Sequence, residues 1–334
     1  MRLYTNEIVF RGHPDKVCDQ ISDALLDAYL SLDKHSRCGI EVMGGKGKIF
    51  ITGEVTSKSV VKRVLKDVGY DANYEIINNL GKQSPDIAMG TNDEVGGAGD
   101  QGMMFGYACN DTKQLLPTAM VILQRFSKWY DKERGKCPYL RSDGKAEITG
   151  YYDDSMKLKR IKYFTISYQN DEEHRDYTDN LIKEACINIC KDYDIEIEEF
   201  LINPTGRFEI GGFEGDSGLT GRKIVVDSYQ SFCKVGGGAF SGKDPTKVDR
   251  SAAYKARLIA KDYLSKYNLS WCEVVISYAI AIDKPLSIYI DSNKGYIEPD
   301  ESLYLECTPK NIIKDLNLLN VCYEEKARFG HFQD

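Results

Sequence analysis

Five consecutive residues near the start of the chain, Gly12–Lys16, combine types that handle phosphate groups. They read Gly-His-Pro-Asp-Lys and open an amphipathic stretch, Pro14–Leu32, whose apolar residues recur every three or four positions and predict a helix. Free N–H groups and the dipole at a helix start attract an anion. His13 can then donate to a leaving-group oxygen and Asp15 can reach a metal ion. A plain capping arrangement with a solvated His13 explains the segment equally well.

Glycine marks further candidate phosphate-binding segments. The glycines cluster at positions 44–47, 96–106, 206–221 and 236–242, and Asp143-Gly-Lys145 is a fifth spot of the same polar kind. Bare backbone can approach a phosphate closely, and successive N–H groups form anion-binding hollows. Neighbouring Lys and Arg neutralise phosphate charge, and isolated carboxylates can hold Mg²⁺ together with phosphate oxygens. The pattern favours binding of a nucleotide or polyphosphate.

Two familiar nucleotide-binding motifs are incomplete. Gly97–Gly102 matches G-x-G-x-x-G, but polar Thr91–Glu94 precedes it where a dinucleotide-binding turn requires a strand. Gly237–Asp244 ends in Gly-Lys-Asp, with Asp where a P-loop has a Ser or Thr that binds Mg²⁺. We therefore expect neither a Rossmann fold nor a P-loop fold, although a lysine beside bare amides still indicates phosphate.

Composition excludes several classes of protein. The 334 residues carry 51 acidic and 44 basic side chains, a net charge of −7, which argues against a nucleic-acid partner. The longest nearly apolar run, Val274–Ile282, is far shorter than the ~20 residues that span a bilayer, and the first ten residues do not resemble a secretory leader. Ten scattered cysteines without a Cys-x-x-Cys pair predict reduced thiols and no zinc site. We expect a cytoplasmic protein without a membrane partner.

The predicted elements interleave without a strict βαβ rhythm and favour an α+β fold with antiparallel pairing. No linker divides the chain, so residues 1–334 are expected to form one interlocked unit. A charged stretch at 170–199 is predicted as a solvated helix with its flanks. Besides the first helix, the sequence predicts helices over Lys58–Lys66, Asp179–Asp192 and Lys247–Tyr267 and strands over Glu41–Met43, Lys48–Val55, Arg160–Tyr168, Glu273–Ile282 and Leu286–Ile290.

Several glycine- and charge-bearing strings follow one another along nearly the whole chain. They are Gly12–Lys16, Gly81–Ile87, Gly97–Gly102, Asn203–Phe208, Gly215-Asp216, Gly218–Lys223, Gly236–Asp244 and Lys247–Tyr254. In content, order and rough spacing they resemble the methionine adenosyltransferase family, also called S-adenosylmethionine synthetases. The resemblance extends from Thr5 to Phe332.

This resemblance implies an architecture. Family members have three similar α+β subdomains, built from non-contiguous segments, around a pseudo-threefold axis. The approximate segments would be 1–100, 101–220 and 221–334, with exchanges between them. A homodimer or homotetramer with active sites between two subunits is also implied.

The resemblance further implies a transferase that forms S-adenosylmethionine from ATP and L-methionine, a step of one-carbon metabolism. The methionine sulfur attacks ribose C5′ and displaces triphosphate, which is then cleaved to pyrophosphate and phosphate. Because the sulfur is already a nucleophile, catalysis must rest on in-line positioning and on stabilising the leaving polyanion. Two Mg²⁺ and a K⁺ per site serve that task in the family.

Matching positions carry implied roles. Catalysis is assigned to His13, Lys145, Asp216, Arg222 and Lys243. ATP binding is assigned to these five residues and to Asp143, Arg207, Phe208, Lys223 and Ala239. Methionine binding is assigned to Glu54, Gln83, Asp216 and Lys247, Mg²⁺ to Asp15 and as a second candidate Asp249, and K⁺ to Glu41. His13 would face the oxygen that leaves C5′, Phe208 would stack on adenine, and Glu54 would meet the methionine ammonium.

Each assignment has a plain structural alternative, a surface ion pair for the charged residues and ordinary core packing for Phe208. Two other functions also stay open, a nucleotide hydrolase without methionine chemistry and a non-catalytic nucleotide-binding subunit. The intact methionine-binding set argues against the first, and intact His13, Asp15 and Lys243 argue against the second.

The chain departs from the family pattern in several places. A stretch after Tyr70 is shorter, the gating loop at Ala88–Val95 has its own sequence, and Ser142 and Gly144 stand where Pro and Ala are common. None of these departures removes a catalytic charge.

Overall fold

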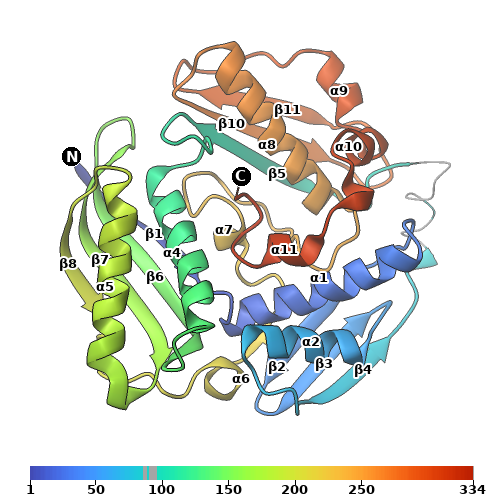
Figure 1. The fold of residues 1–334 in the computed structure, drawn as a ribbon. Helices are drawn as coiled ribbons and strands as arrows, with labels where there is room; N and C mark the ends of the chain where they lie inside the picture. The colour runs from blue at the N-terminus through green and yellow to red at the C-terminus, as the bar shows by residue number, and fades with distance from the viewer. Residues whose placement is uncertain (86–88, 90–95, 334) are drawn as a thin grey trace.

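Three small β-sheets, each covered by helices on one face, surround a common centre (Figure 1). The structure, a computed structural model, describes residues 1–85, 89 and 96–333. The expected gating loop at 88–95 falls almost wholly outside the described residues. Each sheet with its helices forms one subdomain, which confirms the predicted α+β class with three similar subdomains.

The first subdomain holds α1 (Pro14–Leu32) and α2 (Lys58–Val68) against a sheet of order β4-β3-β2-β9. Its strands are β2 (Glu41–Gly45), β3 (Lys48–Gly53), β4 (Glu75–Leu80) and the short β9 (Gly218–Leu219). Strand β2 alternates between exposed and buried side chains, so one face of the sheet packs on the helices and the other faces outward.

The second subdomain contains the longest strands. Its sheet has the order β1-β6-β7-β8, and α4 (Thr118–Arg134) and α5 (Arg175–Lys191) accompany it. Strand β1, at the very start of the chain, pairs antiparallel with β6, Tyr4 lying opposite Gly150. The strands are β1 (Arg2–Val9), β6 (Leu140–Tyr152), β7 (Leu158–Asn170) and β8 (Ile197–Ile202).

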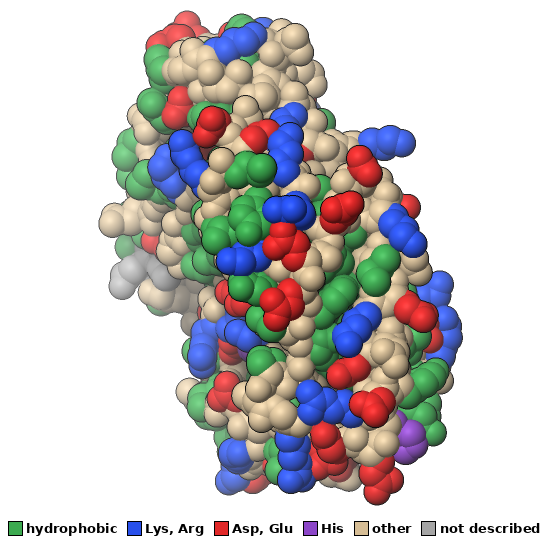
Figure 2. All heavy atoms as spheres, turned by 90° about the vertical axis from the view of Figure 1, so that its left-hand side faces the viewer, with side chains coloured by type: hydrophobic (Ala, Val, Ile, Leu, Met, Phe, Trp, Pro, Cys, Tyr) green, Lys and Arg blue, Asp and Glu red, His purple; other side chains and the backbone are tan. Residues whose placement is uncertain are grey.

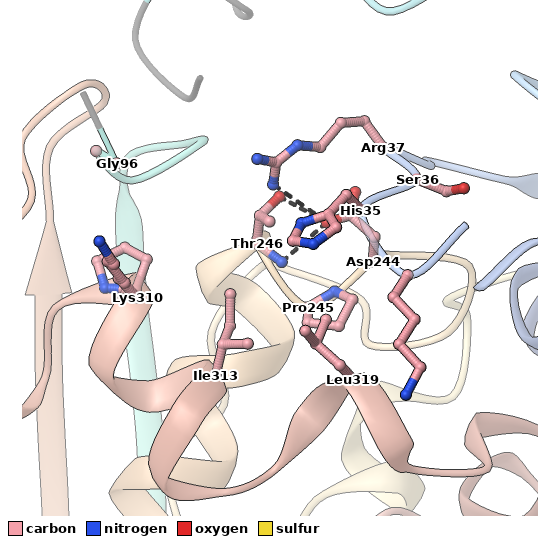
Figure 3. A pocket seen from close by; sticks show the side chains of 13 residues that line it. His35, Ser36, Arg37, Gly96, Asp244, Pro245, Thr246, Lys310, Ile313 and Leu319 are labelled. Carbon is pink, nitrogen blue, oxygen red and sulfur yellow. Dashed lines mark hydrogen bonds and ion pairs between the residues drawn. The ribbon is translucent and has the colours of Figure 1, made fainter. Parts of the chain in front are cut away.

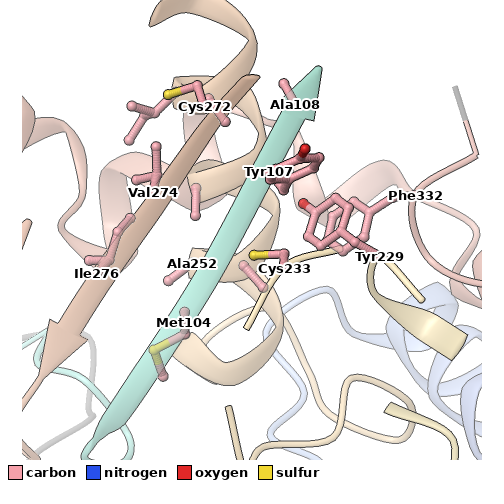
Figure 4. Packing of buried hydrophobic residues seen from close by; sticks show 14 of the residues in the cluster. Met104, Tyr107, Ala108, Tyr229, Cys233, Ala252, Cys272, Val274, Ile276 and Phe332 are labelled. Carbon is pink, nitrogen blue, oxygen red and sulfur yellow. The ribbon is translucent and has the colours of Figure 1, made fainter. Parts of the chain in front are cut away.

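The third subdomain packs α8 (Val248–Lys266) on a sheet of order β11-β10-β5. Helix α8 presents small residues to the sheet, so the two layers approach closely (Figure 4). A Cβ on Gly106 would lie 2.1 Å from the carbonyl carbon of Ala256, so only glycine fits there. Its other elements are β5 (Gly102–Cys109), β10 (Trp271–Tyr278), β11 (Ser287–Ser292), α9 (Ser302–Glu306) and α10 (Pro309–Asp315).

Three short helices complete the fold: α7 (Ile224–Asp227) and α11 (Tyr323–Ala327) lie near the centre, and α6 (Gly212–Gly215) lies beside the first sheet (Figure 1). All eight predicted helices and strands beyond the first are present with small shifts of their ends, and α1 has its predicted bounds. Most strand pairs are antiparallel as predicted, but β3–β4 and β7–β8 are parallel.

All ten cysteines are free thiols, and Cys322 alone is exposed. Among the described helices, none has the length and apolar character needed to cross a bilayer.

Buried ion pairs bind α1 to the rest of the molecule. Both carboxylate oxygens of Asp23 accept hydrogen bonds from Arg250 Nη2, at 2.7 and 2.6 Å, and neither side chain is exposed. Lys16 Nζ lies 2.5 Å from Asp227 Oδ1 and 3.1 Å from an Asp19 oxygen. Burial alone would lower the pKa of Lys16, but the two carboxylates outweigh it and raise that pKa. These pairs join α1 of the first subdomain to α8 of the third subdomain and to α7.

The Arg250–Asp23 pair gives a prediction for stability. The substitution Arg250→Met leaves Asp23 without its charged partner in a fully buried site, so we expect the free energy of unfolding to fall by about 3–5 kcal/mol. Urea titration followed by circular dichroism measures it. As a matched control, Arg2→Met removes an exposed pair with Asp154 and should cost no more than about 1 kcal/mol. Equal losses in the two variants would contradict the role given to the buried pair.

Candidate active site

The start of α1 lies against the glycine-bearing segment that contains β9. A Cβ on Gly218 would lie 2.2 Å from the carbonyl oxygen of Pro14, so glycine permits this approach. Asp15, which is 1% exposed, accepts a hydrogen bond from Leu219 N at 2.9 Å. Its other oxygen lies 2.5 Å from Lys223 Nζ, and Arg222 Nε lies 3.6 Å from the carboxylate. The contact therefore brings two predicted phosphate-binding cations to the helix start.

His13 caps this helix and has a defined tautomer. Its Nδ1 accepts a hydrogen bond from Asp15 N at 3.2 Å, so the proton of the neutral ring is on Nε2. Burial and the positive charge of Lys223 lower the pKa of His13 to about 4. At neutral pH the ring is uncharged and can donate a hydrogen bond through Nε2.

A cavity of about 300 Å³ opens beside His13. Asp143 lines it and accepts a hydrogen bond from Gly212 N at 2.7 Å. Burial raises the pKa of Asp143 to about 6, although hydrogen bonds from backbone N–H groups oppose the shift. Lys145, Phe208 and Asp216 also line this cavity. The structure thus brings together five predicted ATP-binding residues from three distant parts of the chain.

The segment at 236–243 forms a second wall. Lys243 Nζ makes an ion pair with Asp249 at the start of α8. A Cβ on Gly238 would lie 2.2 Å from the Asp249 carboxylate, so this glycine admits the pair. A Cβ on Gly221 would lie 2.6 Å from Ala239 Cβ. The 236–243 segment therefore lies beside the segment that carries Arg222.

The predicted K⁺ ligand lies near the same wall. Gly39 and Lys243 form a β-bridge just before β2, the strand that begins at Glu41. Desolvation raises the pKa of Glu41, and the nearby charge of Lys243 opposes that shift.

Two of the predicted methionine-binding residues are tied to one backbone segment. Glu54 accepts a hydrogen bond from Gly39 N at 2.7 Å. Lys247 Nζ lies 3.4 Å from Asp244, whose other contacts include Cys38 N at 2.8 Å. Gln83 differs, because its buried Nε2 has no hydrogen-bond partner among the described residues. A buried donor without a partner is costly, so it is available to a ligand.

Arg207 is the predicted residue that stands apart. Its guanidinium pairs with Glu209 and is 70% exposed, and it does not line the cavity that Phe208 lines.

Asp19 also contributes to the site, although the sequence did not predict it. It accepts a hydrogen bond from Gly221 N at 2.8 Å and so helps to position the segment that carries Arg222. Asp19 lies four residues after Asp15 and therefore on the same face of the predicted helix, and this spacing could have indicated its role.

The carboxylates suit a magnesium ion that shares its shell with phosphate. Among the residues that the structure describes, no three His, Cys, Asp or Glu side chains gather as a closed metal site. Asp15 and Asp249 each stand near a lysine instead. Mg²⁺ commonly takes one or two carboxylates, with water and substrate phosphates as its other ligands, and these residues fit that mode.

The packing of the 236–243 segment gives a prediction for activity. In Gly238→Ala the new methyl group meets the Asp249 carboxylate, so the Lys243–Asp249 pair must shift and we expect turnover to fall at least about tenfold. Steady-state kinetics measure it. Gly237→Ala is the matched control, because a Cβ there meets nothing within 4 Å. Comparable losses in both variants would contradict this role of Gly238.

The environment of His13 gives a prediction for its titration. The imidazole should titrate near pH 4, about two units or more below an ordinary histidine, because burial and Lys223 disfavour its charged form. Nitrogen-15 NMR of the four histidines follows it, and the signal absent from His13→Asn assigns it. A midpoint near the ordinary value of about 6.5 would contradict the neutral ring.

Comparison with known proteins adds the family. Models for three parts of S-adenosylmethionine synthetase match in series: the N-terminal domain over residues 1–85, the central domain over 95–208 and the C-terminal domain over 210–334. The S-adenosylmethionine synthase of a Nitratiruptor species is 43% identical over 99% of this chain and 92% of its own length. Those of a Sulfurovum species and of Clostridium tetani are each 41% identical over 99% of this chain, and over 92% and 94% of their own lengths. With matches over nearly its whole length, the chain belongs to the S-adenosylmethionine synthetase family of methionine adenosyltransferases.

Proposed function

We propose that the cavity beside His13 binds ATP and that its triphosphate lies between the start of α1 and the 236–243 segment. The observation that carries this proposal is the convergence of Lys145, Lys223 and Arg222 at the buried start of α1, with the segment that carries Lys243 beside the segment that carries Arg222. Basic side chains and free helix N–H groups together are a strong site for a polyanion. Phe208 on the cavity wall would stack on the adenine.

The paired charges support magnesium as a companion of the triphosphate. Lys223 faces Asp15 and Lys243 faces Asp249, so each of these two lysines already has a carboxylate partner. A bare polyanion would be repelled by the two carboxylates, whereas these carboxylates can bind Mg²⁺ that the phosphates also bind. Asp15 and Asp249 would hold these ions, and Glu41 would hold K⁺. When bound, the cations neutralise charge on the leaving triphosphate.

His13 would act on the leaving group. A neutral ring with its proton on Nε2 can donate a hydrogen bond to the oxygen that departs from ribose C5′, where negative charge develops. The methionine sulfur needs no base, since its lone pair is free. Glu54 would bind the methionine ammonium, and Lys247, Gln83 and Asp216 would hold the rest of that substrate in line with the C5′–O bond.

We also propose that two copies of the chain associate through the outward faces of the sheets. Exposed apolar side chains lie on these strands, among them Met43 and Phe50 in the first sheet and Met103 and Tyr289 in the third. Lys145 on β6, which lines the cavity beside His13, is exposed as well, so a partner that also covered the second sheet would lie beside the proposed site. In contrast, the face of β8 and α5 in Figure 2 intersperses basic and acidic side chains. Because the proposed substrates are ATP and L-methionine, we also propose a cytoplasmic location.

The role of His13 can be tested by substitution. His13→Asn keeps a polar side chain but removes the placed donor, so we expect the rate of C5′–O cleavage to fall at least about 100-fold. The dissociation constant of ATP should change much less, since the cations remain. Rapid-quench kinetics and equilibrium dialysis measure the two. Equal losses in rate and in ATP affinity would refute the leaving-group role.

The proposed interface can be tested by charge. Met43→Glu, on the outer face of β2, places a carboxylate in the apolar contact, so we expect the dimer to dissociate and turnover to fall with it. Light scattering after gel filtration reports the mass. Ile187→Glu on α5 is a matched control, because Ile187 is exposed away from the sheet faces. A dimer unaffected by Met43→Glu, or an active monomer, would contradict this arrangement.

A further inference from the structure

A second cavity, of about 380 Å³, lies between the first and third subdomains (Figure 3). The turn that follows α1, the loop at 244–246 and helix α10 line it. Its volume is within the range of small-molecule pockets. None of its lining residues has a role in the adenosyl transfer as proposed above.

Its lining combines an apolar floor with an excess of basic side chains. Pro245, Ile313 and Leu319 form apolar parts of the wall. Lys34 and Lys310 also line the cavity; Lys34 Nζ donates a hydrogen bond to Asn320, and neither lysine pairs with a carboxylate of a described residue. Together with Arg37 they outnumber Asp244, the one carboxylate among the described lining residues, and this local excess of positive charge favours an anion.

The same cavity is connected to the proposed methionine-binding residues by direct contacts. Arg37 lines it and lies 4.0 Å from the fully buried Asp244. Asp244 accepts a hydrogen bond from Cys38 N at 2.8 Å and lies 3.4 Å from Lys247 Nζ. The next N–H along the chain, on Gly39, is the one that holds Glu54. An anion that draws Arg37 toward itself therefore acts on the groups that orient both Lys247 and Glu54.

We propose that this cavity binds a small organic anion, with one negatively charged head group and an apolar body, and that its binding is coupled to that of methionine. The head group would meet Lys310 and Arg37, which Figure 3 shows on different sides of the cavity, and the body would lie on Ile313 and Leu319. The coupling rests on the proposed function, because it assigns Glu54 and Lys247 to methionine.

Anilinonaphthalene sulfonate, an aromatic sulfonate that fluoresces in apolar sites, is the probe for this ligand class. Fluorescence titration of the intact protein should give one bound probe per chain. Lys310→Glu should weaken binding about tenfold or more by reversing a charge at the head group. Lys314→Glu is the matched control, since it makes the same change on α10 at an exposed residue that does not line the cavity. Ile313→Glu should also weaken binding, and thermal unfolding checks that all variants fold.

The coupling between this cavity and the methionine site is measured by repeating the titration in saturating methionine. The dissociation constant of the probe should differ by about fivefold or more between the two titrations. Equal binding by the Lys310→Glu and Lys314→Glu variants, or no effect of methionine, would overturn the proposal. Binding needs no turnover. A protein that binds the probe as expected but makes no S-adenosylmethionine would therefore refute the proposed function and leave the cavity as a binding site.

Discussion

The structure depends on charged residues of α1 that are buried and cannot be left without partners. Four charged side chains of this helix point into the centre of the molecule, and each is less than 2% exposed: Asp15, Lys16, Asp19 and Asp23. Burying a charge costs several kcal/mol unless a well-placed partner compensates it. The partners come from α7, α8 and the segment after β9, so the helix can bury these charges only when the three subdomains are together.

This constraint also shapes the site. The same helix face that pairs with Arg250 at its middle holds Leu219 N and Gly221 N at its start, through Asp15 and Asp19. Those contacts fix the segment that carries the proposed phosphate-binding Arg222 and Lys223. The proposed polyanion site is therefore a continuation of the core network, and the pairing of Lys223 with Asp15 holds that lysine in place before any substrate arrives. Such preorganisation avoids the reorganisation cost that a flexible cluster of cations has in water.

The sequence predicted local features well and long-range ones poorly. Helix α1 has its predicted bounds because its periodicity, its proline and its first acidic residue agree. By contrast, strand β1 was not predicted, since its pairing with β6 joins residues about 140 positions apart. Asp143 and Lys145 were expected in a polar segment of the glycine-rich kind, but they lie within strand β6. Gly144 is needed there because a Cβ would lie 2.7 Å from the Phe10 ring. The local sequence does not predict this long-range contact.

The direct test of this account is a product assay with ATP, Mg²⁺ and K⁺, with and without L-methionine. If the cations around α1 serve adenosyl transfer, S-adenosylmethionine, pyrophosphate and phosphate should form in equal amounts and only when methionine is present. Phosphate release that does not depend on methionine, without S-adenosylmethionine, would contradict the account. The cavity would then be a site of polyphosphate hydrolysis alone.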